Sequence, residues 1–155
     1  MKSLVTFATA AFLLSATTLA VSAQSVHNNW RAEHSRDKVS STNVTIDESR
    51  GLDSTGTPAK AVWVRDFPTA GTYLFKIKYT PIAGREVKLT VNGKIVGTKG
   101  MNAKPSATPE MDCEKASWRP LGDVKFTAGA NTIVMEPVAV DGKLPHVCQF
   151  DAELE

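Results

Sequence analysis

Residues 72–79, TYLFKIKY, decide the fold class of this chain because aromatic or aliphatic side chains occupy every second position. Successive side chains of a strand point to opposite faces of a sheet, so this alternation predicts a strand with one buried face. The positions expected to be buried are Tyr73, Phe75, Ile77 and Tyr79. Lysines at 76 and 78 fall on the opposite, solvent-facing side.

The next segment, EVKLTVNGKIVG at 86–97, repeats the alternation and contains a turn signal. Asn92-Gly93 stands between the two alternating runs. A type I′ hairpin turn needs positive φ at both central residues, and Asn-Gly meets this need best. We therefore expect residues 86–91 to pair with 94–97 as an antiparallel hairpin.

The rest of the chain shows short strand-like runs separated by turn residues, and no segment has sustained helical periodicity. Such a pattern predicts an all-β fold, a two-sheet antiparallel sandwich, over a single domain. Loops are expected at 53–58, 97–117 and 127–131. Further strands are expected around 30–33, 44–47, 61–65, 121–126, 132–136 and 149–154.

The charge composition argues against several kinds of partner. Lysine and arginine number 18 against 16 acidic residues, which gives a formal charge of +2. This balance does not favour nucleic acid or anionic lipid as a partner. The chain also lacks the low-complexity tracts of disordered or fibrous proteins.

The first 23 residues have the pattern of a secretory signal peptide. Lys2 precedes the uncharged stretch 4–20, LVTFATAAFLLSATTLA, and Val21-Ser22-Ala23 places small residues where signal peptidase reads them. We expect cleavage after Ala23, a mature domain over 24–155, and a secreted or periplasmic location. After cleavage no segment is apolar enough to span a membrane.

The two cysteines of the chain, Cys113 and Cys148, both lie in the expected mature domain. An even cysteine count in an exported chain predicts a disulfide bond. Their spacing does not match a CxxC redox motif or a zinc site.

Four blocks occur in an order that resembles carbohydrate-binding modules of families 6 and 35. They are FPTAGTYLFKIKYTP at 67–81, EVKLTVNGKIVG at 86–97, the pattern WxxLGxVxFxAGxNTI at 118–133, and FDAELE at 150–155. The resemblance runs from about Val62 to Leu154. It implies a jelly-roll β-sandwich of the galactose-binding-like type that binds carbohydrate and carries no catalytic residues.

The resemblance also implies site residues, with departures from the family pattern. Trp118 stands alone where the family usually has two tryptophans, and Gln149 replaces the asparagine that helps to bind sugar. If the disulfide forms, it brings Trp118 and Gln149 to the same end of the sandwich. Members of the family often hold a structural calcium ion, for which the corresponding residues are Glu33 and Asp151.

Other interpretations stay open at this stage. Trp118 either packs in the core or presents a flat face to a sugar ring. On the same fold, loop 97–117 would instead dock a protein partner, with Trp118 as its anchor, in a secreted binding or inhibitor domain. Catalysis is disfavoured, since no histidine lies in a known nucleophile or metal-binding motif. The acids Glu110, Asp112 and Glu114 lie in a long loop, where solvent-exposed carboxylates are common. Trp30 and Trp63 are not assigned to core or surface.

Overall fold

The computed structural model describes residues 26–32, 41–47, 51–82, 85–96, 112–138 and 142–155. The regular elements in these ranges are ten strands. No helix in the described ranges is long and apolar enough to cross a membrane. The expected signal peptide, 1–23, and most of the expected loop 97–117 lie outside the described residues.

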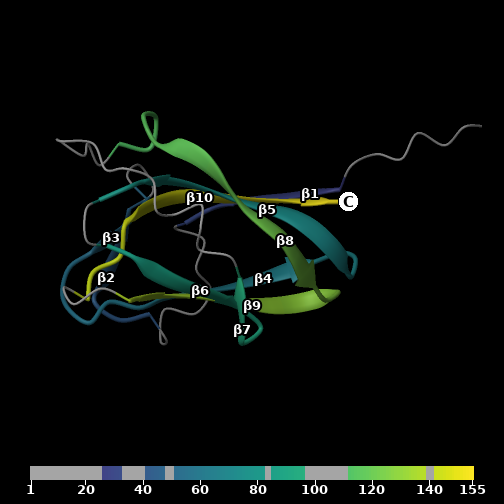
Figure 1. The fold of residues 1–155 in the computed structure, drawn as a ribbon, viewed down its shortest axis with the longest axis horizontal. Coiled ribbons are helices and arrows are strands. Elements are labelled where there is room, and N and C mark those ends of the chain that lie inside the picture. The colour runs from purple at the N-terminus through teal and green to yellow at the C-terminus, as the bar shows by residue number, and fades with distance from the viewer. Residues whose placement is uncertain (1–25, 33–40, 48–50, 83–84, 97–111, 139–141) are drawn as a thin grey trace, which may run out of the picture.

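The strands form two antiparallel sheets that lie one above the other (Figure 1). The first sheet has the order β2-β3-β10-β5-β8, and β1 also pairs with β10. Its strands are β1 (His27–Arg31), β2 (Val44–Asp47), β3 (Gly51–Ser54), β5 (Gly71–Thr80), β8 (Ser117–Phe126) and β10 (His146–Leu154). The second sheet, in the order β4-β9-β6-β7, contains β4 (Ala61–Phe67), β6 (Val87–Val91), β7 (Lys94–Val96) and β9 (Gly129–Pro137). The predicted all-β, two-sheet antiparallel sandwich is confirmed.

The core between the sheets is built largely from aromatic rings. The four residues of β5 expected to be buried are all buried. Trp30 of β1 stacks on Phe150 of β10 at a centroid distance of 5.2 Å. Trp63 of β4 is fully buried, and its indole Nε1–H donates a hydrogen bond of 2.8 Å to the carbonyl of Ala32. Trp30 and Trp63 are therefore core residues.

The predicted hairpin is confirmed. β6 and β7 pair antiparallel, with Val91 opposite Lys94. Asn92 and Gly93 have φ values of 49° and 77°, as a turn with two left-handed residues requires.

Several strand boundaries differ from the sequence expectation because strand pairing, and not local sequence, sets where the strands begin and end. β1 runs over His27–Arg31 and not 30–33, and β10 begins at His146, before the expected 149. The expected loop 53–58 begins later, since β3 runs through Ser54 and pairs with β2. β9 begins at Gly129, inside the expected loop 127–131. β8 begins at Ser117, so Trp118 lies in a strand and not before it.

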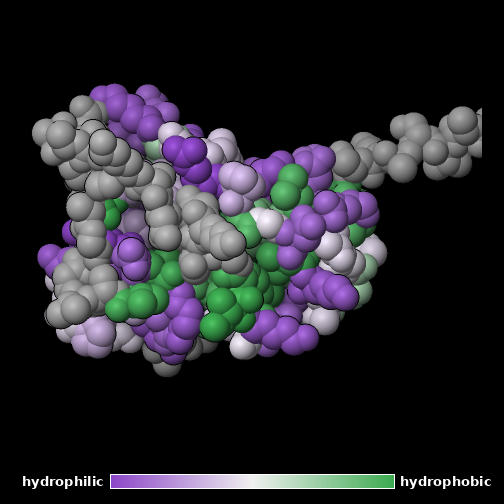
Figure 2. Space-filling model, in the orientation of Figure 1, coloured by the Kyte–Doolittle hydropathy of each residue, from purple (hydrophilic) through white to green (hydrophobic). Residues whose placement is uncertain are grey.

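Hydrophilic residues cover much of the visible surface, and a hydrophobic area lies over the lower layer near β7 (Figure 2). Among the described residues, the large hydrophobic side chains that are exposed are Ile95, Trp118 and Val138. Trp118 is the aromatic member of this group, and aromatic exposure is the feature that a sugar site needs.

Candidate functional site

A single cross-strand row on the outer face of the first sheet joins the two residues expected to bind ligand. Gln149 of β10 pairs with Lys78 of β5, and Lys78 pairs with Trp118 of β8. On the other side of β10, Gln149 pairs with Arg31 of β1. Directly paired residues share a face of the sheet, so one indole, one amide and two cationic side chains lie side by side. We call Arg31, Gln149, Lys78 and Trp118 the outer row.

A β-bulge in β8 puts Trp118 on the outer face. Phe75 pairs with Gly122, whereas the following Lys76 pairs with Pro120, so Leu121 is an extra residue in β8. Strict alternation from the buried Val124 would send Trp118 to the inner face, because the two positions differ by an even number. The extra residue reverses this parity. Trp118 is 40% exposed and does not pack in the core.

A second irregularity lies on the other side of the outer row. Val147 pairs with Tyr79 while Gln149 pairs with Lys78, which leaves Cys148 as an extra residue in β10. Bulges re-aim side chains and are frequent beside functional sites. Here the bulge of β10 adjoins Lys78, and the bulge of β8 lies opposite Phe75 and Lys76 on the other side of β5.

Gln149 has a defined partner in the neighbouring strand. Its Nε2 donates a hydrogen bond to Oδ1 of Asn29 on β1. This bond holds the amide in place beside Lys78 and fixes which end of it faces outward. A held amide is suited to a sugar hydroxyl, since it both donates and accepts hydrogen bonds.

The next residues of β10 on this face form a network of ion pairs. Lys76 Nζ lies 3.1 Å from Glu153 and 3.9 Å from Asp151. His27 places its two ring nitrogens 3.6 Å from the same two carboxylates. These contacts connect β1, β10 and β5 around the two acids of β10.

The expected calcium ligands are described only in part. Glu33 lies outside the described residues. The imidazole of His27 and the ammonium group of Lys76 lie beside Asp151, and an ammonium group 3.9 Å from the carboxylate does not suit a divalent cation. The surroundings of Asp151 therefore do not fit calcium as they stand, and a shared site with Glu33 stays a prediction.

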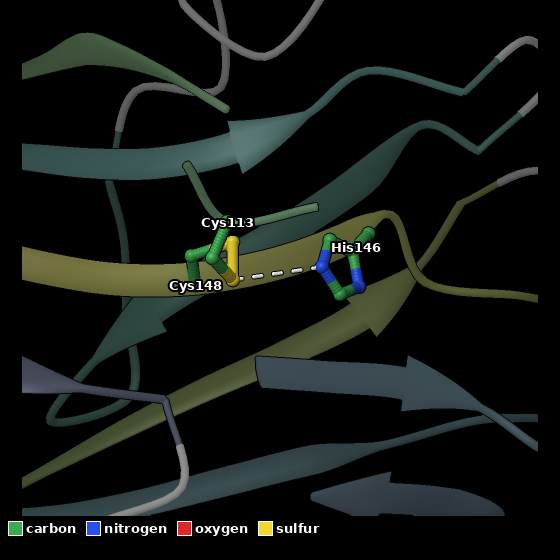
Figure 3. A group of neighbouring side chains, drawn as sticks. All are labelled: Cys113, His146 and Cys148. Carbon is green, nitrogen blue, oxygen red and sulfur yellow. Dashed lines mark hydrogen bonds between the residues drawn. A yellow bond between two sulfur atoms is a disulfide. The ribbon is translucent and has the colours of Figure 1, made fainter. Parts of the chain in front are cut away.

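The structure contains the predicted disulfide. Cys113 and Cys148 are joined with their Cα atoms 5.5 Å apart. His146 is buried beside them, with Nε2 3.6 Å from Cys113 Sγ (Figure 3). These three side chains form a compact Cys-His-Cys group, but both sulfurs are in the disulfide and offer no thiolate to a metal.

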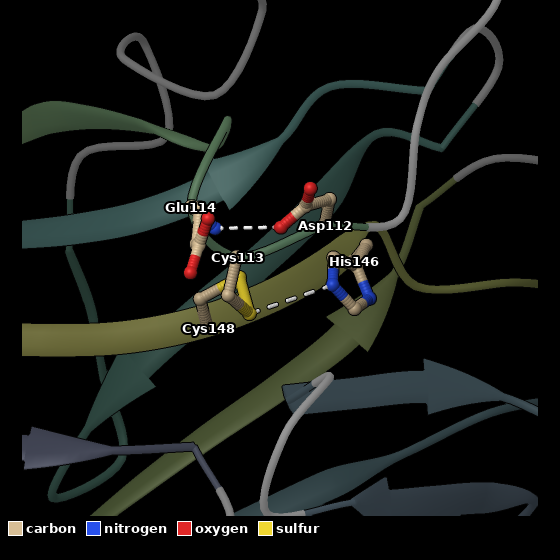
Figure 4. The surroundings of a disulfide bond; sticks show 5 residues. All are labelled: Asp112, Cys113, Glu114, His146 and Cys148. Carbon is tan, nitrogen blue, oxygen red and sulfur yellow. Dashed lines mark hydrogen bonds between the residues drawn. A yellow bond between two sulfur atoms is a disulfide. The ribbon is translucent and has the colours of Figure 1, made fainter.

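Asp112, one of the acids near the disulfide, has a structural role. Asp112 Oδ1 accepts a hydrogen bond of 2.8 Å from the backbone N–H of Glu114, which shapes the turn that carries Cys113 (Figure 4). Of the other residues considered for catalysis, Glu110 and His34 lie outside the described ranges. His27 belongs to the ion-pair network and His146 to the disulfide environment.

Sequence reasoning did not include Arg31 and Lys78 in the site. The alternation of 72–79 already placed Lys78 on the solvent face, but only the pairing of β5 with its two neighbours shows that Lys78 separates Gln149 from Trp118. Arg31 joins the row through the pairing of β1 with β10, which links positions far apart in the sequence.

The fold matches that of solved carbohydrate-binding modules. A family 35 module from Paenibacillus barcinonensis superposes with a TM-score of 0.55 at 18% identity, covering 81% of this chain and 97% of that one. A family 35 module from Clostridium thermocellum gives a TM-score of 0.55 at 18% identity, with 82% and 97% covered. No family model matches the sequence, and no curated protein matches it either.

A third similar structure is larger than this chain. It is a GH26-CBM35 β-(1,4)-mannanase from Podospora anserina, with a TM-score of 0.56 at 17% identity. The match covers 83% of this chain but 28% of the mannanase. Together the comparisons establish the jelly-roll fold of family 35 modules, as the sequence resemblance implied. At these identities the likeness concerns the fold.

Proposed function

We propose that this protein is an exported, non-catalytic carbohydrate-binding module that binds a glycan through the outer row. The observation that carries the proposal is the partly exposed Trp118 in register with Lys78 and Gln149 on the outer face of the first sheet. The fold of family 35 modules supports it.

The chemistry of the row suits a sugar. The indole offers a flat apolar surface to the C–H face of a pyranose, while the amide and the cationic groups beside it donate hydrogen bonds to ring hydroxyls. The two strands in the middle of the row, β5 with Lys78 and β10 with Gln149, are paired on both sides, and β8 with Trp118 is paired along its length with β5. The backbone that carries the site is therefore held before ligand arrives, and little ordering cost is added on binding.

A binding role without catalysis is supported by the described acids. Asp151 and Glu153 are ion-paired, and Asp112 accepts a backbone hydrogen bond. A glycosidase instead needs two carboxylates that face each other across the scissile bond. The solved structures from Paenibacillus barcinonensis and Clostridium thermocellum are carbohydrate-binding modules, and the match to this chain covers 97% of each.

Trp118→Ala tests the function. A glycan array with the mature domain identifies a ligand, and calorimetry then measures its affinity for the wild type and the variant. We expect binding to weaken at least about tenfold, with a melting temperature close to that of the wild type, because Trp118 lies on the surface.

Trp63→Ala serves as the contrasting variant. Trp63 is fully buried, so its loss is expected to cost about 3–5 kcal/mol of stability. If Trp118→Ala lowers stability like Trp63→Ala, Trp118 is not a ligand-stacking residue. A well-folded wild type that binds no glycan would favour the protein-binding alternative, with Trp118 as the anchor of that interface.

Export is tested separately by the intact mass of the protein recovered from outside the cytoplasm. The n-region at Lys2, the apolar stretch and Val21-Ser22-Ala23 support cleavage after Ala23. We expect a mass that corresponds to a chain starting at Gln24. A mass that includes Met1 would contradict the proposed processing.

A further inference from the structure

A pocket of about 420 Å³ opens between the two sheets at the end of the sandwich opposite the disulfide. From the first sheet it is lined by Thr72, Lys125, Phe126 and Thr127, and from the second by Val91 and Lys94, among others. Thr72 and Lys78 are six residues apart on β5, about 20 Å along a strand. The pocket is therefore separate from the outer row.

The charge of the pocket is positive. Lys94 and Lys125 line it, and neither has an ion-pair partner among the described residues; no acid is among the residues that line it. The described acids near this end of β5 are Glu155, whose backbone N–H donates to the carbonyl of Thr72 at 3.1 Å, and Asp123 and Glu153, which both pair with Leu74; none of the three lines the pocket. Two uncompensated ammonium groups at one opening favour an anion.

The floor of the pocket is apolar. Phe126 and Val91 line it, and both are nearly completely buried in the sandwich core. The hydroxyl-bearing Thr72 and Thr127 lie on the same side as Phe126. A volume of 420 Å³ falls in the range of small-molecule sites and accommodates a ring-sized ligand.

A buried asparagine holds the two walls of the pocket together. Asn131 is fully buried, and its Oδ1 accepts hydrogen bonds from Thr127 N at 2.9 Å and from Asn92 Nδ2 at 2.7 Å. Its Nδ2 donates to the carbonyls of Thr127 and Gly129 at 2.7 and 2.9 Å. Asn131 thus links the β8–β9 turn to the β6–β7 turn, which fixes the walls without a ligand.

We infer that this pocket, which we call the end pocket, binds an oxyanion carried on a ring-sized organic group, such as a sulfated sugar. The ammonium groups of Lys94 and Lys125 receive the oxyanion, and the Phe126–Val91 floor receives the apolar face of the ring. The inference does not depend on the outer row, because the two sites lie at opposite ends of β5.

The test is a titration of the ¹⁵N-labelled mature domain with galactose 6-sulfate, galactose and inorganic sulfate in low-salt buffer. We expect galactose 6-sulfate to shift the amide resonances of Gly93, Lys125 and Thr127, and to bind at least about tenfold more tightly than the other two probes. Under this assignment tight binding needs both the ring and the oxyanion in one ligand.

Variants locate the site. Lys94→Ser and Lys125→Ser are each expected to weaken binding about tenfold, and the double variant to abolish it. Lys60→Ser is the control variant, because it removes the same charge at a distance from the end pocket. Lys60 precedes β4, and the other end of β4 lies beside the pocket, where Phe67 pairs with Gly129. This variant is expected to leave binding unchanged.

Several results would overturn the assignment. If galactose bound as tightly as galactose 6-sulfate, the oxyanion would have no role, and if inorganic sulfate bound as tightly, the ring would have none. Amide shifts confined to the outer row, or no amide shifts at all, would also contradict the assignment. Should a serine variant fail to fold, Lys94→Gln and Lys125→Gln remove the charge and keep the aliphatic stem.

Discussion

Gly51 packs directly against the disulfide. It begins β3 with a φ of 85°, in the left-handed region. A Cβ at this position would collide with the carbonyl oxygen of Val147 and lie 3.1 Å from both Cys113 Sγ and Cys148 Cα. Glycine is thus required here both for its backbone conformation and for its lack of a side chain.

Gly51→Ala is expected to destabilise the fold by more than about 2 kcal/mol, because backbone strain and a backbone clash add. The measurement is chemical denaturation followed by tryptophan fluorescence. Gly93→Ala is the matched control, since Gly93 has a φ of 77° but no atom within 4 Å of the added Cβ. Equal losses from the two variants would show that the clash with Val147 contributes nothing.

The element scale is governed by the strand register. In the first sheet, two bulges set which face the ends of β8 and β10 present: the bulge of β10 lies beside Lys78, and the bulge of β8 lies opposite Phe75 and Lys76. In the second sheet the register is regular, and Lys88 of β6 pairs directly with Glu136 of β9. Lys88 Nζ lies 2.9 Å from Glu136, and Lys60 Nζ lies 3.5 Å from it on the other side.

These contacts make a small part of the stability dependent on pH. The hydrogen bond from Lys88 and the charges of both lysines lower the pKa of Glu136 in the folded protein. A lowered folded-state pKa gives stability that is fully present above the ordinary glutamate value and is lost as the pH falls through the folded-state pKa.

Glu136→Gln is therefore expected to lower stability at pH 7 by less than about 1 kcal/mol, since the pair is partly exposed. The difference from the wild type is expected to shrink as the pH falls below the ordinary glutamate pKa, about 4.3, and to be lost as the pH passes through the lowered folded-state pKa. Denaturation curves between pH 3 and 7, in steps of about one unit, measure it. Glu114→Gln is the control, because Glu114 has no ion-pair partner among the described residues. If the loss of stability in Glu136→Gln stayed constant across this pH range, the prediction would be wrong.

At the scale of the whole molecule, the disulfide joins the segment before β8 to the extra residue of β10. It closes a loop with a sequence separation of 35 residues. On the chain-entropy estimate, closing such a loop stabilises the native state by about 3–4 kcal/mol. The outer row begins immediately beside the bridge, because Gln149 follows Cys148.

Replacing both cysteines by serine is expected to lower the free energy of unfolding by about 3–4 kcal/mol. Thermal and chemical denaturation measure it, with the wild type before and after reduction by a phosphine as the comparison. Alkylation should detect two thiols only after reduction. Two reactive thiols in the untreated, oxidised protein would contradict the bond seen in the structure.

Much of the fold was predictable from local pattern. The alternation of 72–79 predicts the buried face of β5, and Asn92-Gly93 predicts the turn between β6 and β7; both depend on the preferences of neighbouring residues. The cysteine count predicted the disulfide, because only one pairing of two cysteines exists. These features are predictable because the strand and the turn depend on residues that are close in sequence, and because two cysteines allow a single pairing.

The tertiary structure alone decided where the site residues point. In a regular strand ending at Phe126, Trp118 would face the core, and one extra residue at Leu121 reverses it. The same holds for Arg31 and Lys78, which join Gln149 only through pairing between distant strands, and for Asn131, whose buried amide links two turns. Side-chain parity and long-range register depend on how whole sheets pair, and a bulge that changes parity by one residue leaves no periodic signal in the sequence.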